Sequence, residues 1–258
     1  MTDLTLRAET YRQTTDAYRA TAIVGEAGLT HQFSDTVKGS VAVSVERSHV
    51  VDAMMTAEDH LLTSLTSSVD WDTRDSRFDP TKGLHALLTS SASYDFLQKN
   101  AFATVRGDLS VYRALDRSAR FVLAGRVSVA TLFAGDILDV PADRRLYAGG
   151  AGSVRGYAYR NIAPRDMSDN LIGGKSLFEV SGEVRYRVND QLGLVGFIDA
   201  GNAYASAFPK FTKLKFGVGA GVRYLTPVGP LRFDAAIPLQ RGPGDPKFAV
   251  YVGLGQAF

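Results

Sequence analysis

The sequence of 258 residues contains no cysteine and no long apolar run. Without cysteine there is no disulfide framework and no thiolate metal site. No stretch approaches the roughly 18 consecutive apolar residues that a transmembrane helix needs. Net charge is also nearly absent, because 29 basic residues face 27 acidic ones. This balance argues against a protein that binds nucleic acid by bulk charge.

The first seven residues also lack the basic and apolar regions of a secretory signal. A cytoplasmic protein is expected to look this way. In an outer-membrane protein, the same start implies that the signal has been removed, or that the chain begins inside a longer protein.

What the sequence does contain is apolar and aromatic residues, at 45% hydrophobic with 14 Phe and 11 Tyr. This content is too high for a disordered chain. One large or two small soluble domains fit the length. A transmembrane β-barrel fits it equally well, because its alternating strands are of intermediate hydropathy on average.

Alternation with a period of two is the dominant pattern. In residues 214–222 the even positions are apolar, and the odd positions carry lysine or glycine. In residues 178–188 one face is apolar, while the other carries Glu179, Glu183, Arg185 and Arg187. Four charges on one face of a strand argue against a packed core there, although a soluble sandwich also wets one face of each strand.

The pattern recurs in about 12 segments, a number within the range of outer-membrane barrels. Several segments reach the roughly 9–11 residues needed to cross a bilayer obliquely. We therefore predict an all-β fold, an antiparallel transmembrane β-barrel of about 12 strands forming one domain over residues 1–258 in the bacterial outer membrane. The segments are 4–13, 18–33, 36–47, 60–71, 83–96, 101–112, 119–132, 177–188, 192–203, 213–225, 230–239 and 247–258.

One connector, residues 135–174, is far longer than the others and has no alternating stretch of strand length. Residues 147–157 within it read YAGGAGSVRGY. This run resembles the signature of the outer-membrane assembly and secretion barrels, the bacterial surface antigen family that includes BamA, TamA and two-partner secretion transporters. The resemblance implies an extracellular loop that folds into the lumen and carries Val154, Arg155, Gly156 and Tyr157.

Three further stretches match the family in the correct order, and TamA-like members are the most similar. Residues 72–83 resemble the family's turn motif. Gly173 and Gly174, followed by Glu183, resemble one later strand, and residues 197–201 resemble the next. The turn motif residues are Asp72, Arg74, Asp75, Pro80 and Gly83.

The family resemblance also implies partners for the loop arginine. A guanidinium is always charged, and burying it unpaired inside a barrel is costly. Glu183 lies on the charged, lumen-facing side of its segment, and Asp199 lies opposite Ile198 and Ala200. By resemblance, Glu183 and Asp199 are the carboxylates that hold Arg155 by charge-assisted hydrogen bonds.

The last segment resembles the carboxy-terminal recognition strand of outer-membrane proteins, which ends in an aromatic residue, here Phe258. Val250, Val252 and Leu254 share its face with Phe258. Tyr251, Gly253 and Gly255 form the other face, and the glycines would weaken its hold on the first strand at a seam. Close approach of the loop to small lumenal residues is an equally good reading of these glycines.

No catalytic or metal site is evident. The four histidines lie on polar faces or near turns, no Gly-x-Ser-x-Gly elbow occurs, and no His-x-x-x-His pair exists. The glycine-rich run lacks the Lys-Ser/Thr ending of a P-loop. We therefore expect no enzyme activity, no metal and no cofactor. Outer-membrane phospholipases are also β-barrels, so a lipid-cleaving enzyme that uses His85 is a rival hypothesis.

The function implied by the resemblance is insertion or translocation of β-rich outer-membrane proteins, by templating an incoming strand on a sheet edge. The alternative is a passive pore or structural barrel. The expected partners are outer-membrane lipids and nascent β-barrel or passenger proteins, with no nucleic acid, and an oligomer is compatible with the pattern. Compared with full-length relatives, we expect the first four strands and every periplasmic repeat to be missing, in a naturally short or a shortened protein.

Overall fold

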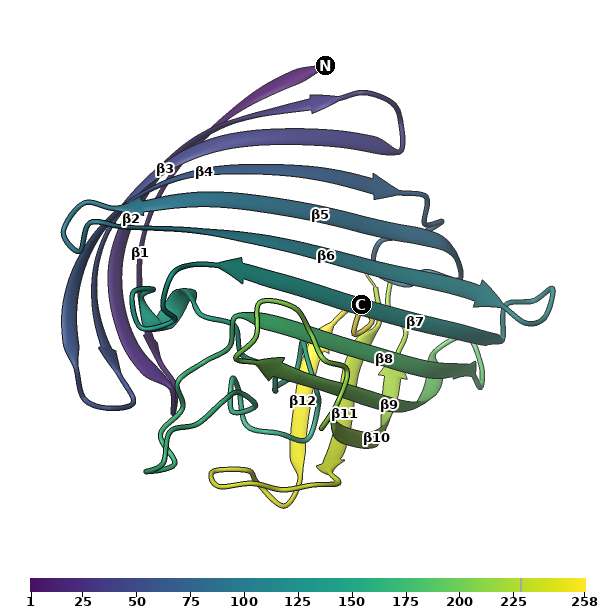
Figure 1. The fold of residues 1–258 in the computed structure, drawn as a ribbon. Helices are drawn as coiled ribbons and strands as arrows, with labels where there is room; N and C mark the ends of the chain where they lie inside the picture. Colours follow the sequence, from purple (N-terminus) through teal and green to yellow (C-terminus); the bar gives the residue numbers. More distant parts are fainter. Residues whose placement is uncertain (228) are drawn as a thin grey trace.

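The computed structural model describes residues 1–227 and 229–258, and these residues form one antiparallel sheet of 12 strands. Each strand pairs with the next one along the chain, from β1 to β12 (Figure 1). The all-β prediction is confirmed, and each predicted segment overlaps one strand. The strands are β1 (Thr2–Thr14), β2 (Tyr18–Gln32), β3 (Val37–Asp52), β4 (Ala57–Asp72), β5 (Lys82–Asp95), β6 (Asn100–Ala114), β7 (Phe121–Phe133), β8 (Ser176–Arg187), β9 (Leu192–Tyr204), β10 (Lys215–Tyr224), β11 (Leu231–Pro238) and β12 (Ala249–Leu254).

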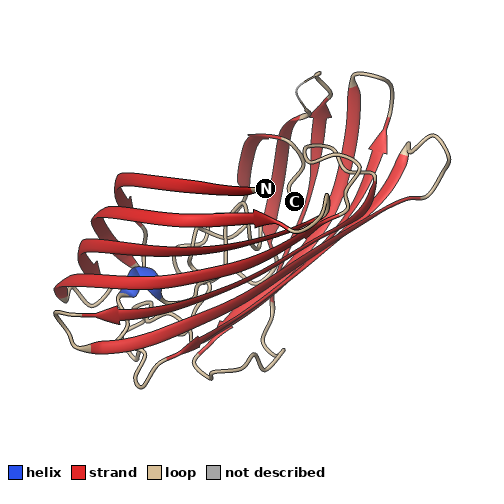
Figure 2. Cartoon of the chain, turned by 90° about the horizontal axis from the view of Figure 1, so that it is seen from above, coloured by secondary structure: helices blue, strands red, loops and turns tan. Residues whose placement is uncertain are grey.

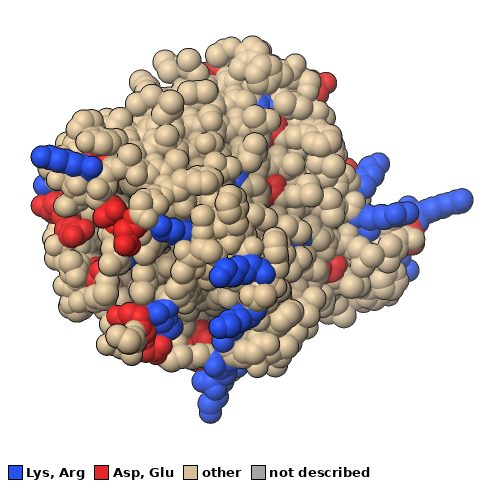
Figure 3. Space-filling model, in the orientation of Figure 1, with Lys and Arg blue, Asp and Glu red and all other residues tan. Residues whose placement is uncertain are grey.

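The two faces of the sheet differ as the alternation predicts. On β8, Val184 is 50% exposed on the convex side, while its neighbour Glu183 is 3% exposed on the concave side. Charged side chains therefore lie inside the curl and apolar ones outside, the reverse of a soluble protein. Figure 3 shows this outer surface as a broad uncharged area, with Lys and Arg side chains projecting near its ends.

Connectors alternate between two rims because consecutive strands run in opposite directions. The connectors that follow odd-numbered strands share one rim, here called the plug rim. The connectors that follow even-numbered strands lie at the other rim, with both chain ends, and this is called the opposite rim.

Residues 134–175, between β7 and β8, are called the plug loop. They lie inside the curve of the sheet (Figures 1 and 2) and include a single-turn 3-10 helix, η1 (Ala142–Arg144). Ala148, Val154 and Tyr157 are buried in one cluster with Leu177 and Ala203 of the sheet. The long connector predicted from the sequence thus folds into the lumen. Among the described residues, no helix is long and apolar enough to cross a membrane.

The strands β1 and β12 form the two edges of the sheet, and they do not meet. Among the described residues, no Cα atom of β1 lies within 8 Å of a Cα atom of β12. Figure 1 shows the two chain ends well apart at the opposite rim. The sheet is curled like a barrel, yet each edge strand is paired on one side alone.

The carboxy-terminal strand is shorter than predicted. It was expected to run to Phe258 with that ring on the outer face, but β12 ends at Leu254. Gly255 has a φ of +85°, a left-handed conformation that glycine adopts without a steric penalty, and the chain turns inward there. The Phe258 ring then lies 6.3 Å from the ring of Tyr112 and 5.5 Å from the Arg185 guanidinium. The arginine-lined lumen attracts this ring and its terminal oxygen, which corrects the prediction for Gly255 and Phe258.

Candidate functional site

The tip of the plug loop carries the four motif residues, and all four are buried against the inner face of the sheet. A tight turn precedes them: Ser153 donates its N–H to the oxygen of Gly150 at 3.1 Å, and Gly150 donates to Val154 at 3.2 Å. Gly149 and Gly150 both have φ near +105°, which residues with a side chain rarely adopt. This turn directs Val154 and Arg155 toward the sheet wall.

Gly156 brings the plug backbone into direct contact with the last strands. Its φ is +98°, and a Cβ atom there would lie 2.7 Å from the backbone carbon of Ile237 on β11. No real side chain fits at that distance. The residue type is therefore dictated by the close approach of loop and strand.

Arg155 is the centre of the site, and it is held by the two carboxylates paired with it in the sequence analysis. Its Nε and Nη2 atoms donate to the two oxygens of Asp199 at 2.7 and 2.8 Å. Its Nη1 donates to Glu183 at 2.8 Å, and its backbone N–H donates to Asp199 at 3.1 Å. The bidentate fork fixes the orientation of the guanidinium as well as its position.

Sequence reasoning missed two more partners of Arg155. Asp234 on β11 accepts a hydrogen bond from Nη1 at 3.3 Å, and the Phe197 ring lies 3.4 Å from the guanidinium carbon. The alternation of Leu231 and Phe233 with polar residues does place Asp234 on the lumenal face. This alternation does not indicate that β11 reaches Arg155.

The electrostatics of the site keep Arg155 charged. Burial alone would lower its pKa, but the bonds from Asp199 and Glu183 outweigh burial and raise the pKa above its ordinary value. The side chains of Asp199, Glu183 and Asp234 have no exposed surface. Buried ions are tolerated only when they are paired and hydrogen-bonded, so the four groups depend on one another.

Two tyrosines fasten the residues that follow Arg155. The hydroxyl of Tyr251 on β12 accepts the N–H of Gly156 at 2.9 Å. The hydroxyl of Tyr157 donates to the backbone oxygen of Phe216 on β10 at 3.0 Å, and it accepts the N–H of Gln240 at 3.1 Å. The motif therefore contacts every strand from β8 to β12 through side chain or backbone.

The turn motif lies elsewhere, at the opposite rim between β4 and β5. Arg74 donates two hydrogen bonds to Asp72, at 2.9 and 2.8 Å. Asp75 accepts the backbone N–H and the hydroxyl of Thr81 at 2.9 and 2.6 Å. Burial by itself would raise the pKa of Asp75, but these hydrogen bonds hold it below its ordinary value.

The same turn reaches the carboxy-terminal tail. Pro80 is fully buried, and Gly83 has a φ of +100° with no room for a Cβ atom beside Thr73. The backbone oxygen of Phe78 accepts the N–H of Gln256 at 3.0 Å. The turn motif thus supports the tail, and among the described residues it forms no hydrogen bond or ion pair with Arg155.

The glycines of the last segment are packed against side chains of the sheet and turn. A Cβ atom on Gly253 would lie 3.2 Å from Arg232, and one on Gly255 would lie 3.5 Å from Phe78. Of the four residues predicted for this strand and seam, Tyr251 and Gly253 belong to β12, whereas Gly255 and Phe258 lie in the inward-turned tail.

Histidines in the first half of the sheet bond to carboxylates. His60 donates or accepts through Nδ1 with Asp95 at 2.6 Å, and His85 lies 3.1 Å from Asp70. Within residues 1–227 and 229–258, no group of three or more His, Cys, Asp or Glu side chains is placed to hold a metal ion. The arrangement around Arg155 can hold the plug loop against the strands β8 to β12.

Comparison with known sequences identifies relatives. A sequence model described as the Omp85 superfamily domain matches residues 2–258. The outer membrane protein assembly factor BamA of Nitratidesulfovibrio vulgaris is 34% identical over 177 residues, which are 66% of this chain and 22% of that protein. BamA of Neisseria meningitidis serogroup B is 28% identical over 180 residues, which cover 56% of this chain and 22% of that protein. The chain thus spans about a fifth of the length of these curated relatives.

Solved structures share the fold. BamA from Haemophilus ducreyi lacking POTRA domains 1–3 superposes with a TM-score of 0.80 at 17% identity, over 96% of this chain and 57% of that one. CdiB from Escherichia coli gives a TM-score of 0.59 at 15% identity, over 97% of this chain and 49% of that one. The match over nearly all residues, with the BamA relatives, shows that this chain is an outer-membrane β-barrel protein that belongs to the Omp85 superfamily.

Proposed function

We propose that this chain inserts or translocates β-rich outer-membrane proteins by lending a free sheet edge to an incoming strand. The observation that carries the proposal is the pair of unpaired edges, β1 and β12, in a sheet of this superfamily. An unpaired edge offers a row of N–H and C=O groups, and an extended chain binds to it by backbone hydrogen bonds.

The register indicates which edge groups are free. The N–H of Gln32 donates to the oxygen of Met1 at 3.0 Å, so odd-numbered residues of β1 face β2. Even-numbered residues, such as Leu6, therefore point their N–H and C=O groups away from the sheet. On β12, the N–H of Gly255 donates to the oxygen of Pro230, so odd-numbered residues face β11. Val252 and the other even-numbered residues of β12 therefore point their N–H and C=O groups toward the free edge.

The plug motif supports this proposal by holding one side of the sheet firm. Arg155 and Tyr157 fasten β8 to β11, whereas β1 is exposed on both faces over its first half. Rigid strands β8 to β11 beside a free edge suit a template strand that must bind and release incoming strands. The outer apolar face would contact outer-membrane lipids during this exchange.

The test uses the purified chain in lipid vesicles, with a urea-unfolded outer-membrane β-barrel protein as substrate. Heat-modifiable gel mobility reports how fast the substrate folds. Leu6→Pro removes one edge donor, and we expect it to slow substrate folding severalfold, whereas Leu6→Ala keeps the N–H and is the matched control. Wild-type vesicles that fold the substrate no faster than empty vesicles would refute the proposal.

A passive pore is the second candidate, favoured by a lumenal cavity of about 420 Å³ that hydroxyl and charged side chains line between β1–β6 and the plug loop. Steady conductance in planar bilayers, together with no gain in substrate folding, would select the pore. We propose no enzymatic activity. Phospholipid hydrolysis by the wild type that disappears in His85→Ala would contradict that expectation.

A further inference from the structure

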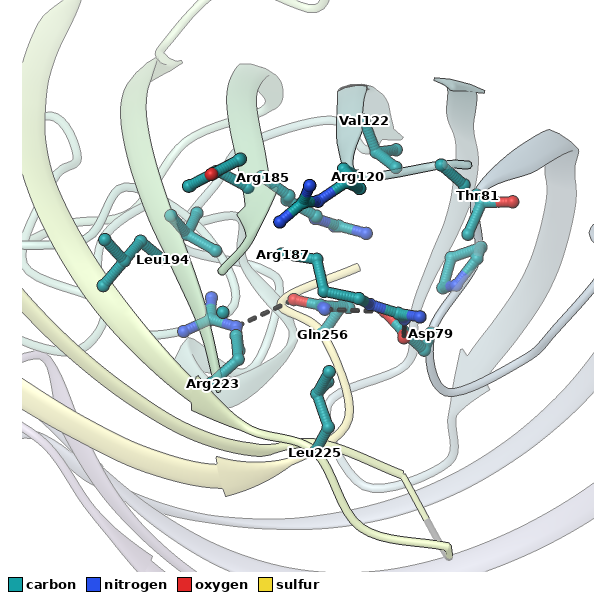
Figure 4. A pocket seen from close by; sticks show the side chains of 15 residues that line it. Asp79, Thr81, Arg120, Val122, Arg185, Arg187, Leu194, Arg223, Leu225 and Gln256 are labelled. Atoms are coloured by element: carbon teal, nitrogen blue, oxygen red, sulfur yellow. Dashed lines mark hydrogen bonds and ion pairs between the residues drawn. The ribbon is translucent and has the colours of Figure 1, made fainter. Parts of the chain in front are cut away.

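A second cluster of charge lies at the opposite rim, away from the tip of the plug loop. A cavity of about 30 Å³ opens there between β8, β9 and β10 and the connectors before β5 and β7. Figure 4 shows four arginines gathered around Gln256 at this cavity. They are Arg120, Arg185, Arg187 and Arg223, and the acidic side chain among the lining residues is that of Asp79.

The buried network behind the cavity contains more arginine side chains than acidic side chains. Within the described residues, four guanidiniums form ion pairs with three buried carboxylate side chains, and Arg185 also donates to the terminal oxygen of Phe258. The arginines are Arg155, Arg185, Arg223 and Arg232, and the carboxylates are Glu183, Asp199 and Asp234. A buried guanidinium is costly when one of its N–H donors lacks an acceptor.

One guanidinium at the cavity has an unused donor. Arg185 is 5% exposed, and its Nη1 atom is buried without a hydrogen-bond partner among the described residues. Its Nε donates to Glu183 at 2.9 Å, and its Nη2 donates to the oxygen of Phe258 at 3.3 Å. A buried donor without an acceptor normally signals a missing partner.

Arg120 adds an unneutralised charge at the mouth of the cavity. Its Nη2 donates to the backbone oxygen of Val188 at 3.1 Å, and no carboxylate of the described residues forms an ion pair with it. Asp79 is already engaged, because it accepts from Arg187 and from Gln256, both at 2.9 Å. Among the described residues, Arg120 therefore has no anionic partner, and Arg185 keeps one buried N–H donor free.

We propose that this cavity binds a phosphate group, held by Arg120 and by the free Nη1 of Arg185. Its volume of about 30 Å³ exceeds the roughly 10–15 Å³ that one water needs, so a small oxyanion fits and a larger ligand can enter with its phosphate alone. Guanidinium groups bind phosphate through paired N–H donors, and Arg120 supplies a positive charge that no carboxylate of the described residues neutralises. The phosphate belongs either to a phospholipid headgroup or to a soluble anion.

The first experiment titrates inorganic phosphate into the whole chain, purified in a phosphorus-free detergent at constant ionic strength. Phosphorus-31 line broadening and the shift in melting temperature report binding. Arg120→Gln removes one charge-assisted contact from an exposed position, so we expect the dissociation constant to rise about tenfold. Arg117→Gln, on the same connector but not lining the cavity, is the matched control and should bind as the wild type does.

The second experiment identifies the source of the phosphate. The chain is extracted from membranes, washed in the same detergent, and assayed for retained lipid phosphorus. Retained phospholipid that is lost in Arg120→Gln and kept in Arg117→Gln would assign a lipid headgroup; saturable binding of inorganic phosphate alone would assign a soluble anion. The proposal is overturned if neither depends on Arg120, or if the two variants behave alike.

Discussion

The two halves of the sheet, β1–β6 and β7–β12, enclose different interiors. Strands β3 and β4 have 16 residues each, whereas β12 has 6, so the first half is taller. Its lumenal face carries small hydroxyls that bond to one another, while the second half packs buried charges around the plug loop. The hydroxyl pairs are Ser40 with Ser68 and Ser64 with Ser93, both at 2.8 Å, and Thr66 with Ser91 at 3.1 Å.

This contrast locates the side-chain contribution to stability. Neutral hydroxyl pairs beside an open cavity can be replaced by water at little cost, and a backbone ladder remains. In the second half, Arg155 and its carboxylates have no such replacement because they are buried. The first half is therefore held mainly by its backbone and the second half by its side chains, and four substitutions test this division.

The largest effect is expected from Asp199→Ala. It leaves the Arg155 guanidinium buried without its bidentate partner, so unfolding in urea should become easier by about 3–5 kcal/mol. The loop should also become sensitive to protease. Asp70→Ala in the first half is the control: its side chain is 41% exposed beside His85, and we expect less than about 1 kcal/mol. Equal losses in the two variants would erase the contrast between the halves.

Gly156→Ala should be next, with a loss of about 2–3 kcal/mol. The alanine would need a left-handed φ and would place its Cβ atom against the backbone of Ile237. Gly152→Ala in the same loop is the matched control, because its Cβ atom would meet no atom within 4 Å. Melting followed by gel mobility should show Gly152→Ala within about 0.5 kcal/mol of the wild type. A tolerated Gly156→Ala would mean that the loop is seated more loosely than described.

Asp95→Ala tests a buried carboxylate of the first half that bonds to a histidine. The Asp95 carboxylate is fully buried, bonds to His60 at 2.6 Å and accepts the N–H of Leu97 at 3.0 Å. Leaving both donors unpaired should cost about 2 kcal/mol in urea unfolding. Glu58→Ala, whose carboxylate is 45% exposed and 3.9 Å from His60, should cost less than about 0.5 kcal/mol. A loss as large as that of Asp199→Ala would show that the first half is also held by side chains.

The smallest effect is expected at the hydroxyl pairs. Ser64→Ala leaves the hydroxyl of Ser93 without its partner and should cost about 0.5–1 kcal/mol. The double variant Ser64→Ala/Ser93→Ala removes both groups, and its stability should return close to that of the wild type. Urea titration of the single and double variants provides the measurement. A double variant that loses more than the sum of the singles would contradict the view that these pairs are replaceable by water.

Much of this architecture could be predicted from alternation and one motif. A period of two reports which face each residue occupies, and that is why Glu183 and Asp199 could be placed in the lumen with Arg155. It does not report distances across the lumen. Asp234 was therefore missed as a partner, although it lies on the expected face.

The same limit applies to two features at the edges of the sheet. Alternation continues through Phe258, yet Gly255 permits a turn and the lumenal arginines draw the ring inward. The pairing of β1 with β12 was expected as a seam, and local pattern carries no information on whether two edges a chain length apart approach each other. Long-range geometry decides both features.

The position of Arg155 in the chain has a consequence for the order of folding. Its three carboxylate partners lie on β8, β9 and β11, all of which follow it in sequence. Because the chain is synthesised from its amino terminus, Arg155 is added before any of the carboxylates that neutralise it. The loop can be seated only after those strands have paired, which makes plug docking a late, long-range step. A refolding chain should therefore acquire protease resistance in the loop after its strands have formed.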